Sequence, residues 1–161
     1  MGMIWIALAV DEATAEGIKT DPAVLWDLEE KLAEENDPRL VDLDKAWHGI
    51  HWLLTGSVGE GERPLADAIF GGEEFGEDNG YGRPRHLCAD CTAKVHAALS
   101  ALDDAELMSR YDGAAMNAAE LYPVGIWEKD GHEYTLDHLA GLRAFYAYAA
   151  ARGLSVIQQI T

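Results

Sequence analysis

Apolar residues form short runs at the two ends of the chain, and these runs predict β-strands. Residues 3–10 are rich in Ile, Leu and Val and contain no turn-forming residue, and residues 154–160 also form an apolar-rich terminal segment. Most of the chain between them has the periodicity of helices. This arrangement predicts an α+β fold, a single helix-rich domain whose small sheet includes the N- and C-terminal strands.

Capping residues and helix-breaking residues divide the central region into separate helices. Asp11 is suited to cap a short helix that ends near Gly17, and Asp21 with Pro22 is a favourable start for a second helix. A further helix is expected after Asp103. Residues 122–127 are expected to be extended because they contain Pro123. The other predicted helices cover residues 44–55, 64–70, 89–102, 112–121 and 135–152.

Residues 71–86 form the longest stretch without periodicity, and they are rich in glycine and acidic residues. Loops of this length in compact domains are usually functional or mobile. The sequence therefore predicts one domain over residues 1–161, with residues 71–86 as a long loop.

The helix predicted at residues 44–55 carries a polar stripe on an otherwise apolar surface. At about 100° per residue, Asp44, His48, His51 and Thr55 fall within about 60° of the helical wheel. A helix so apolar is mostly buried, so its polar stripe needs hydrogen-bond partners, a ligand or a water-filled cleft. These residues are therefore candidates for a functional site.

Two kinds of role fit this stripe. His48 or His51 could be a general base oriented by Asp44, and the same three residues are chemically adequate ligands for zinc or iron. The structural alternative is that Asp44 caps the helix, the histidines make buried hydrogen bonds, and Thr55 bonds back to a carbonyl near His51. No second-shell ligand can be named, so we favour the structural alternative and predict no metal.

Positive charge gathers in one turn, residues 80–86, which leads into a helix N-terminus. Arg83, Arg85 and His86, with Tyr81, form a candidate site for a phosphate or a carboxylate. The alternative is that both arginines pair with the neighbouring acidic residues 73–78. With Thr55, these four residues are the predicted ligand-binding positions.

The two cysteines, Cys88 and Cys91, form a C-x2-C pair near the start of a predicted helix. Together with His96 they fit a C-x2-C-x4-H zinc spacing, but the fourth ligand would fall on Ala101. A capping position and a small buried thiol explain the pair more simply, and we favour that interpretation. The sequence leaves open whether these cysteines take part in redox or metal chemistry.

Composition excludes several classes of partner. The formal net charge is −17, from 12 Lys and Arg against 29 Asp and Glu, so phosphate backbones are repelled and a basic protein is favoured as a partner. No apolar run approaches the roughly 18 residues that span a bilayer, and the start lacks a basic leader region. We expect a cytoplasmic protein that binds neither nucleic acid nor membranes. No cofactor motif is present, and none is predicted.

Several segments together resemble the YfbM-like bacterial proteins, a family classed as a domain of unknown function. They include residues 43–56 (LDKAWHGIHWLLTG) and 116–123 (MNAAELYP), and it is the whole set that is specific. Residues 1–4, 64–72, 80–87 and 126–127 also match, in the same order along the chain. One departure is LCADC at residues 87–91, where such proteins often have LTPEE. The resemblance implies a single-domain cytosolic protein of mixed α and β structure, with no established activity, cofactor or catalytic residue.

Two functions remain as hypotheses. The favoured one is a non-catalytic binding or interaction module for a basic protein partner or a small anionic ligand. The alternative is a small enzyme acting on an anionic metabolite. His48 or His51 would then be the base, and Arg83 or Arg85 would hold the anion. That alternative requires the polar stripe and the basic turn to share one cleft.

Overall fold

The two terminal strands lie side by side in the middle of one antiparallel sheet. The computed structural model describes residues 2–161 and orders the strands β2-β1-β5-β4-β3. β1 pairs with β5 along its whole length, from Trp5 opposite Ile160 to Val10 opposite Ser155. The predicted sheet with both terminal strands is confirmed. The strands are β1 (Trp5–Val10), β2 (Leu40–Asp42), β3 (Glu73–Glu74), β4 (Arg85–Leu87) and β5 (Ser155–Ile160).

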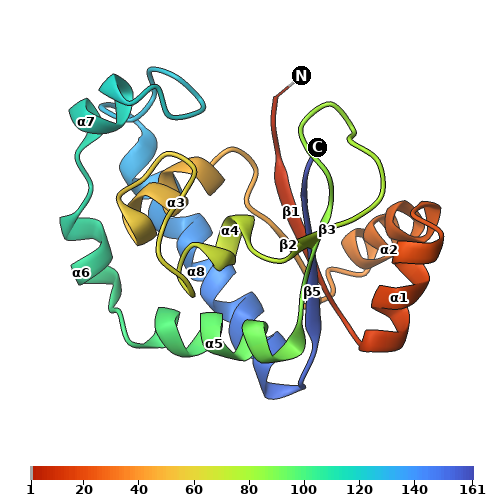
Figure 1. The fold of residues 1–161 in the computed structure, drawn as a ribbon. Coiled ribbons are helices and arrows are strands. Elements are labelled where there is room, and N and C mark those ends of the chain that lie inside the picture. Colours follow the sequence, from red (N-terminus) through yellow and green to blue (C-terminus); the bar gives the residue numbers. More distant parts are fainter. Residues whose placement is uncertain (1) are drawn as a thin grey trace.

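Helices cover both faces of this sheet. Figure 1 shows α1 and α2 on one side, and α3, α4, α5 and α8 on the other. None of the helices within residues 2–161 combines the length and apolar character needed to cross a membrane. The helices are α1 (Glu12–Thr20), α2 (Ala23–Glu34), α3 (Trp47–Thr55), α4 (Asp67–Phe70), α5 (Ala89–Ser100), α6 (Asp104–Ser109), α7 (Gly113–Ala118) and α8 (Gly131–Ala151).

Successive side chains of a strand point to opposite faces, and this alternation builds two separate hydrophobic cores. Leu8 and Ile157 pack with α1 and α2 in one core. Trp5, Ala7 and Val156 lie in the other, together with residues of α8. Each residue of β4 and β5 is therefore assigned to one face by its position, and this determines the environment of every polar side chain on these strands.

The predicted start of α3 was wrong by three residues, and this removes Asp44 from the helix. The backbone N–H of Leu43 donates to Trp5 O (3.0 Å), and the Trp5 N–H donates to Asp44 O (3.1 Å). These bonds hold the chain beside β1, so it turns into the helix only at Trp47. Asp44 has a φ of +45° in the connecting turn and is neither a member of the helical stripe nor the helix cap.

The segment 71–86 is more ordered than its composition predicts. Glu73 and Glu74 pair with His86 and Arg85, so a short β3–β4 hairpin closes a loop over residues 75–84. Gly72 makes the approach possible, because it has a φ of +97° and a Cβ there would lie 2.5 Å from the His86 carbonyl oxygen. Strands of two and three residues are too short for a detectable alternation.

Residues 122–127, expected to be extended, form turns between α7 and α8.

Candidate functional site

The His48 ring is buried and joins α3 to two loops. Its Nδ1 accepts a hydrogen bond from the backbone N–H of Tyr122 (2.9 Å), so the proton lies on Nε2, which donates to Val58 O (2.8 Å). The ring also stacks on Trp47 with centroids 4.6 Å apart. Both nitrogens are therefore used in structural contacts, as the structural alternative for the stripe predicts.

His51 is fully buried, and neither ring nitrogen makes a well-formed hydrogen bond among residues 2–161. The backbone of Glu60 and Gly59 lies close enough to offset part of the effect of burial on its pKa. The ring packs edge-on against Phe70, with centroids 4.7 Å apart. Burial, the largest effect, lowers the pKa of His51 to about 4, so the imidazole is neutral at pH 7. One turn later, the Thr55 hydroxyl donates to His51 O (2.8 Å), as predicted.

Asp44 is held by a different part of the molecule. Its Oδ2 accepts a hydrogen bond from the Tyr134 hydroxyl on α8 (2.8 Å), and that hydroxyl accepts one from the Lys45 N–H (3.0 Å). Burial and the bond to Asp44 raise the pKa of Tyr134 to about 12. In the described part of the chain, the donor atoms of Asp44, His48 and His51 do not form a metal-sized cluster.

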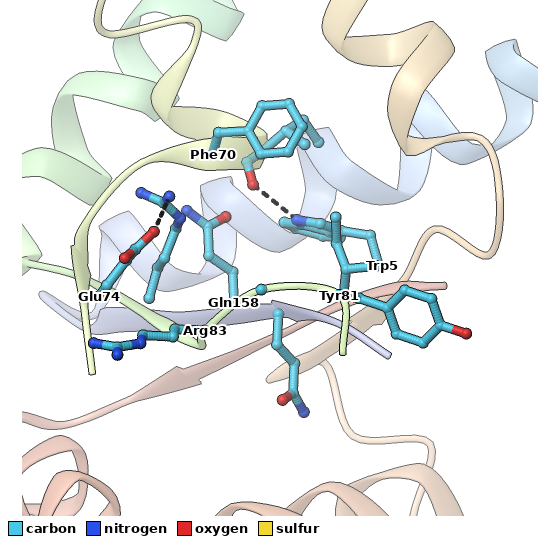
Figure 2. A pocket seen from close by; sticks show the side chains of 11 residues that line it. Trp5, Phe70, Glu74, Tyr81, Arg83 and Gln158 are labelled. Atoms are coloured by element: carbon cyan, nitrogen blue, oxygen red, sulfur yellow. Dashed lines mark hydrogen bonds and ion pairs between the residues drawn. The ribbon is translucent and has the colours of Figure 1, made fainter. Parts of the chain in front are cut away.

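A cavity of about 130 Å³ lies where the β3–β4 hairpin meets the C-terminal end of β5, and we call it the hairpin cavity (Figure 2). It brings together three of the predicted ligand-binding residues, and it excludes His86, Thr55 and the α3 histidines. Its lining includes Trp5, Phe70, Glu74, Tyr81, Arg83, Arg85 and Gln158.

Three neighbouring strands position the inner part of this cavity. Arg85 on β4 lies directly opposite Gln158 on β5, so their side chains share one face of the sheet. Trp5 at the start of β1 completes the floor, and its indole N–H donates to Ile69 O (2.9 Å) beside Phe70. Figure 2 shows the Gln158 amide between Glu74 and Trp5, while Tyr81 and Arg83 extend to opposite rims.

Gln158 is the polar residue of this cavity that the sequence did not single out. It is only 1% exposed, and its Nε2 donates to the carbonyl oxygens of Gly71 (2.5 Å) and Asp67 (3.2 Å). Two acceptors fix the amide orientation, so Oε1 must face the other way. No described residue donates to that oxygen. A buried acceptor left unpaired costs about 1–3 kcal/mol, which a donor on a ligand would recover.

Charge in the hairpin cavity is opposite to that of the whole chain. The lining residues carry two arginines and one carboxylate, a local charge of +1 in a protein of net charge −17. Arg85 pairs with Glu74 (2.5 Å), as the structural alternative for the basic turn predicts. Arg83 forms no ion pair within 4.0 Å among residues 2–161. At longer range its charge adds to the backbone hydrogen bonds from Gly80 and Gly82 that lower the pKa of Asp78.

His86 points to the opposite face of β4 and lines a second cleft, together with Cys88 and Cys91. Cys88 caps α5: its Sγ accepts from the Cys91 N–H (3.3 Å) and lies 2.7 Å from the Cys91 Sγ. This interaction with Cys88, followed by burial, raises the pKa of the Cys91 thiol. His96 instead contacts Ser100 (3.5 Å).

The buried His51 predicts a loss of stability in acid. Its folded pKa of about 4 lies below its ordinary value of 6.5, so the unfolded chain binds more protons as pH falls between these values. The corresponding part of the unfolding free energy is fully present above pH 6.5. About 3 kcal/mol of it is lost as the pH falls to 4. We expect His51→Leu to flatten the dependence of the unfolding free energy on pH in this window.

Urea denaturation at several pH values measures this effect. His132→Leu, at an exposed histidine, is the matched control and should leave the wild-type slope unchanged. A His51→Leu variant that retains the wild-type slope between pH 6.5 and 4 would show that the imidazole is not held neutral by burial.

Comparison with known proteins gives a family and a fold. A family model described as a domain of unknown function, DUF1877, matches residues 1–159. The crystal structure of a protein of unknown function, YfbM from Escherichia coli, is similar, with a TM-score of 0.72 and 21% sequence identity over 99% of this chain and 100% of that one. A search of curated proteins finds no match. At this identity the likeness to YfbM shows the fold alone.

Proposed function

Because the chain belongs to the DUF1877 family, whose description assigns no activity, we propose a function from the geometry: it binds a small organic anion in the hairpin cavity. The observation that carries this proposal is that one cavity is lined, within residues 2–161, by an arginine without an ion pair and by a buried amide whose oxygen has no donor. Arg83 offers the charge at the rim, and Gln158, which also lines the cavity, has a buried Oε1 without a donor in this part of the chain.

The lining of the cavity narrows the chemistry of the ligand. A cavity of roughly 150 Å³ accepts a benzene ring, so about 130 Å³ suits a ligand of similar or smaller size. An arginine at the rim favours a carboxylate, while Gln158 Oε1 requires an O–H or N–H donor. Trp5 and Phe70 supply apolar walls. A small hydroxycarboxylate has all of these features.

The loop above the cavity is held in place before any ligand arrives. Asp78 accepts hydrogen bonds from the N–H groups of Gly80 (2.7 Å) and Gly82 (3.0 Å), which close the loop tip. The Asn79 side chain donates to Ile160 O (2.8 Å) and so ties the loop to the end of β5. A preformed loop reduces the entropy lost on binding.

The residues lining the cavity favour binding over catalysis. Arg85 is oriented by Glu74, and His48 and His51 lie outside the lining. The enzyme alternative needs a general base beside the bound anion, within direct or one-water reach of the proton it removes. Binding alone needs only the two arginines, the amide and the apolar walls.

Substitution of Arg83 tests the proposal. Arg83→Met should weaken binding of a hydroxycarboxylate such as malate or lactate by about tenfold or more, because a hydrogen bond to a charged group contributes about 1.5–3 kcal/mol. Gln158→Leu should also weaken binding of the hydroxycarboxylate. It should have a smaller effect on a carboxylate that lacks the hydroxyl group. Isothermal titration calorimetry at low salt measures both.

The matched control is Arg152→Met, at an exposed arginine that lies over the Tyr148 ring. It changes the net charge equally and should leave the affinity unchanged. Equal weakening by Arg83→Met and Arg152→Met would mean that only the overall charge matters, and the hairpin cavity would not be the binding site.

A second candidate function is docking of a basic protein on the outer face of α2. Trp26 is 48% exposed and Val24 is 39% exposed, which is unusual for residues of this size. Asp27 and Glu30 lie one helical turn from them and are exposed. Val24 and Trp26 are two residues apart and point to different sides of the helix, so each has its own acidic neighbour. Trp26 with Glu30 suits a partner that combines an apolar contact with positive charge.

Substitution on α2 tests this candidate. If α2 docks a basic protein, immobilised wild-type protein should retain that partner at low salt, and Val24→Ser with Trp26→Ala should reduce retention by about tenfold. Val124→Ser, at a valine that is 67% exposed elsewhere, is the control. Retention that survives the α2 substitutions, or that is insensitive to salt, would contradict this candidate.

A further inference from the structure

One imidazole and two carboxylates come together beside the second cleft, on the face of β4 opposite the hairpin cavity; His86 and Glu12 line that cleft. Glu12 and Glu16 lie one turn apart on α1, and His86 lies in the middle of β4. One donor atom from each residue lies within 4.8 Å of the others. No other group of three potential ligands is found this close within residues 2–161.

His86 is the feature that distinguishes this group from a surface cluster of acids. The side chain is only 7% exposed, and its Nε2 has no hydrogen-bond partner among the described residues. That nitrogen faces Glu12 Oε1 at 3.8 Å. Burial, the largest effect, lowers the pKa of His86, and Lys19 adds to the shift, so the ring is neutral and can present a lone pair at Nε2.

The two carboxylates differ in their other contacts. Glu12 is oriented from behind, because its Oε2 accepts from the Ser155 hydroxyl (2.8 Å) and leaves Oε1 toward His86. Glu16 pairs with Lys19 (3.0 Å), which is the competing cation at this position. Like charges one helical turn apart destabilise a helix, and a shared cation removes that repulsion.

We propose that Glu12, Glu16 and His86 bind a divalent transition-metal ion, with Zn²⁺ as the best match. Zinc takes imidazole and carboxylate ligands at about 2.0–2.2 Å, so the donor atoms must close in slightly, which the exposed side chains of Glu12 and Glu16 permit. Three protein ligands leave one coordination position open toward the cleft. This site is separate from the anion-binding function proposed above and does not depend on it.

Cys88 and Cys91 line the same cleft and are the competing zinc ligands. Their sulfur atoms are hydrogen-bonded to each other and are not members of the three-residue group. A double variant, Cys88→Ser with Cys91→Ser, therefore separates the two sets of ligands. The proposed site should bind zinc in this background with the wild-type stoichiometry of one ion per chain.

Titration with Zn²⁺ alone, by calorimetry at physiological salt, tests the proposal in that background. Glu16→Gln and Glu12→Gln should each weaken binding by about tenfold or more, and both positions are exposed, so the variants should fold. His86→Gln should abolish it. Glu133→Gln, an exposed acid in the first turn of α8, changes the net charge equally and should have no effect.

Two results would overturn the proposal. One is loss of zinc binding in the double cysteine variant, which would assign the metal to the thiols. The other is equal weakening by Glu16→Gln and Glu133→Gln, which would show that zinc follows the overall negative charge. Circular dichroism of each variant verifies folding, and the two glutamate variants decide the matter if His86→Gln is unstable.

Discussion

The pairing of β1 with β5 is the constraint on which the rest of the structure depends. Six residue pairs join the two ends of the chain, and β5 then pairs with β4 on its other side. Because β5 lies between two strands and beneath helices on both faces, each of its side chains has one fixed environment. Gln158 shares the α4 side with Arg85, and Ile157 shares the α1 side with His86. Adjacent residues of β4, Arg85 and His86, therefore line two separate clefts.

Electrostatics gives these two sites opposite preferences. The hairpin cavity is locally positive in a strongly acidic chain, which is the charge that the proposed anion site requires. On the other side of β4, Glu12 and Glu16 concentrate negative charge beside a neutral imidazole, which favours a cation. One short strand separates the two environments, and the alternation of its side chains keeps them apart.

The sequence predicted the features that depend on local interactions. Asp11 and Asp103 cap helices through their side chains, and the expected strands at both ends pair with each other. The back-bond from Thr55 to His51 O also follows from helical spacing alone. These features need only neighbouring residues, so periodicity and capping preferences are sufficient to find them. The fold class follows from them.

The features that sequence analysis missed depend on contacts between distant segments. Asp44 leaves the helix because Trp5 on β1 holds the turn before it. His86 was grouped with Arg85 because the two are adjacent, yet β4 turns them to opposite faces. Little in the neighbouring sequence distinguishes Gln158 from other strand residues, because its amide is oriented by the distant carbonyl groups of Asp67 and Gly71. The pair Gln158-Gln159 inside a predicted strand was the one available signal, since buried amides need partners.

The most direct measurement is a two-dimensional ¹H–¹⁵N spectrum recorded while malate is added to the whole protein. If the alternation of β4 defines two independent sites, the side-chain signals of Gln158 and Arg85 should shift in a saturable manner, and the His86 ring signals should stay in place. Shifts at His86 and Glu12 without a change at Gln158 would contradict this account.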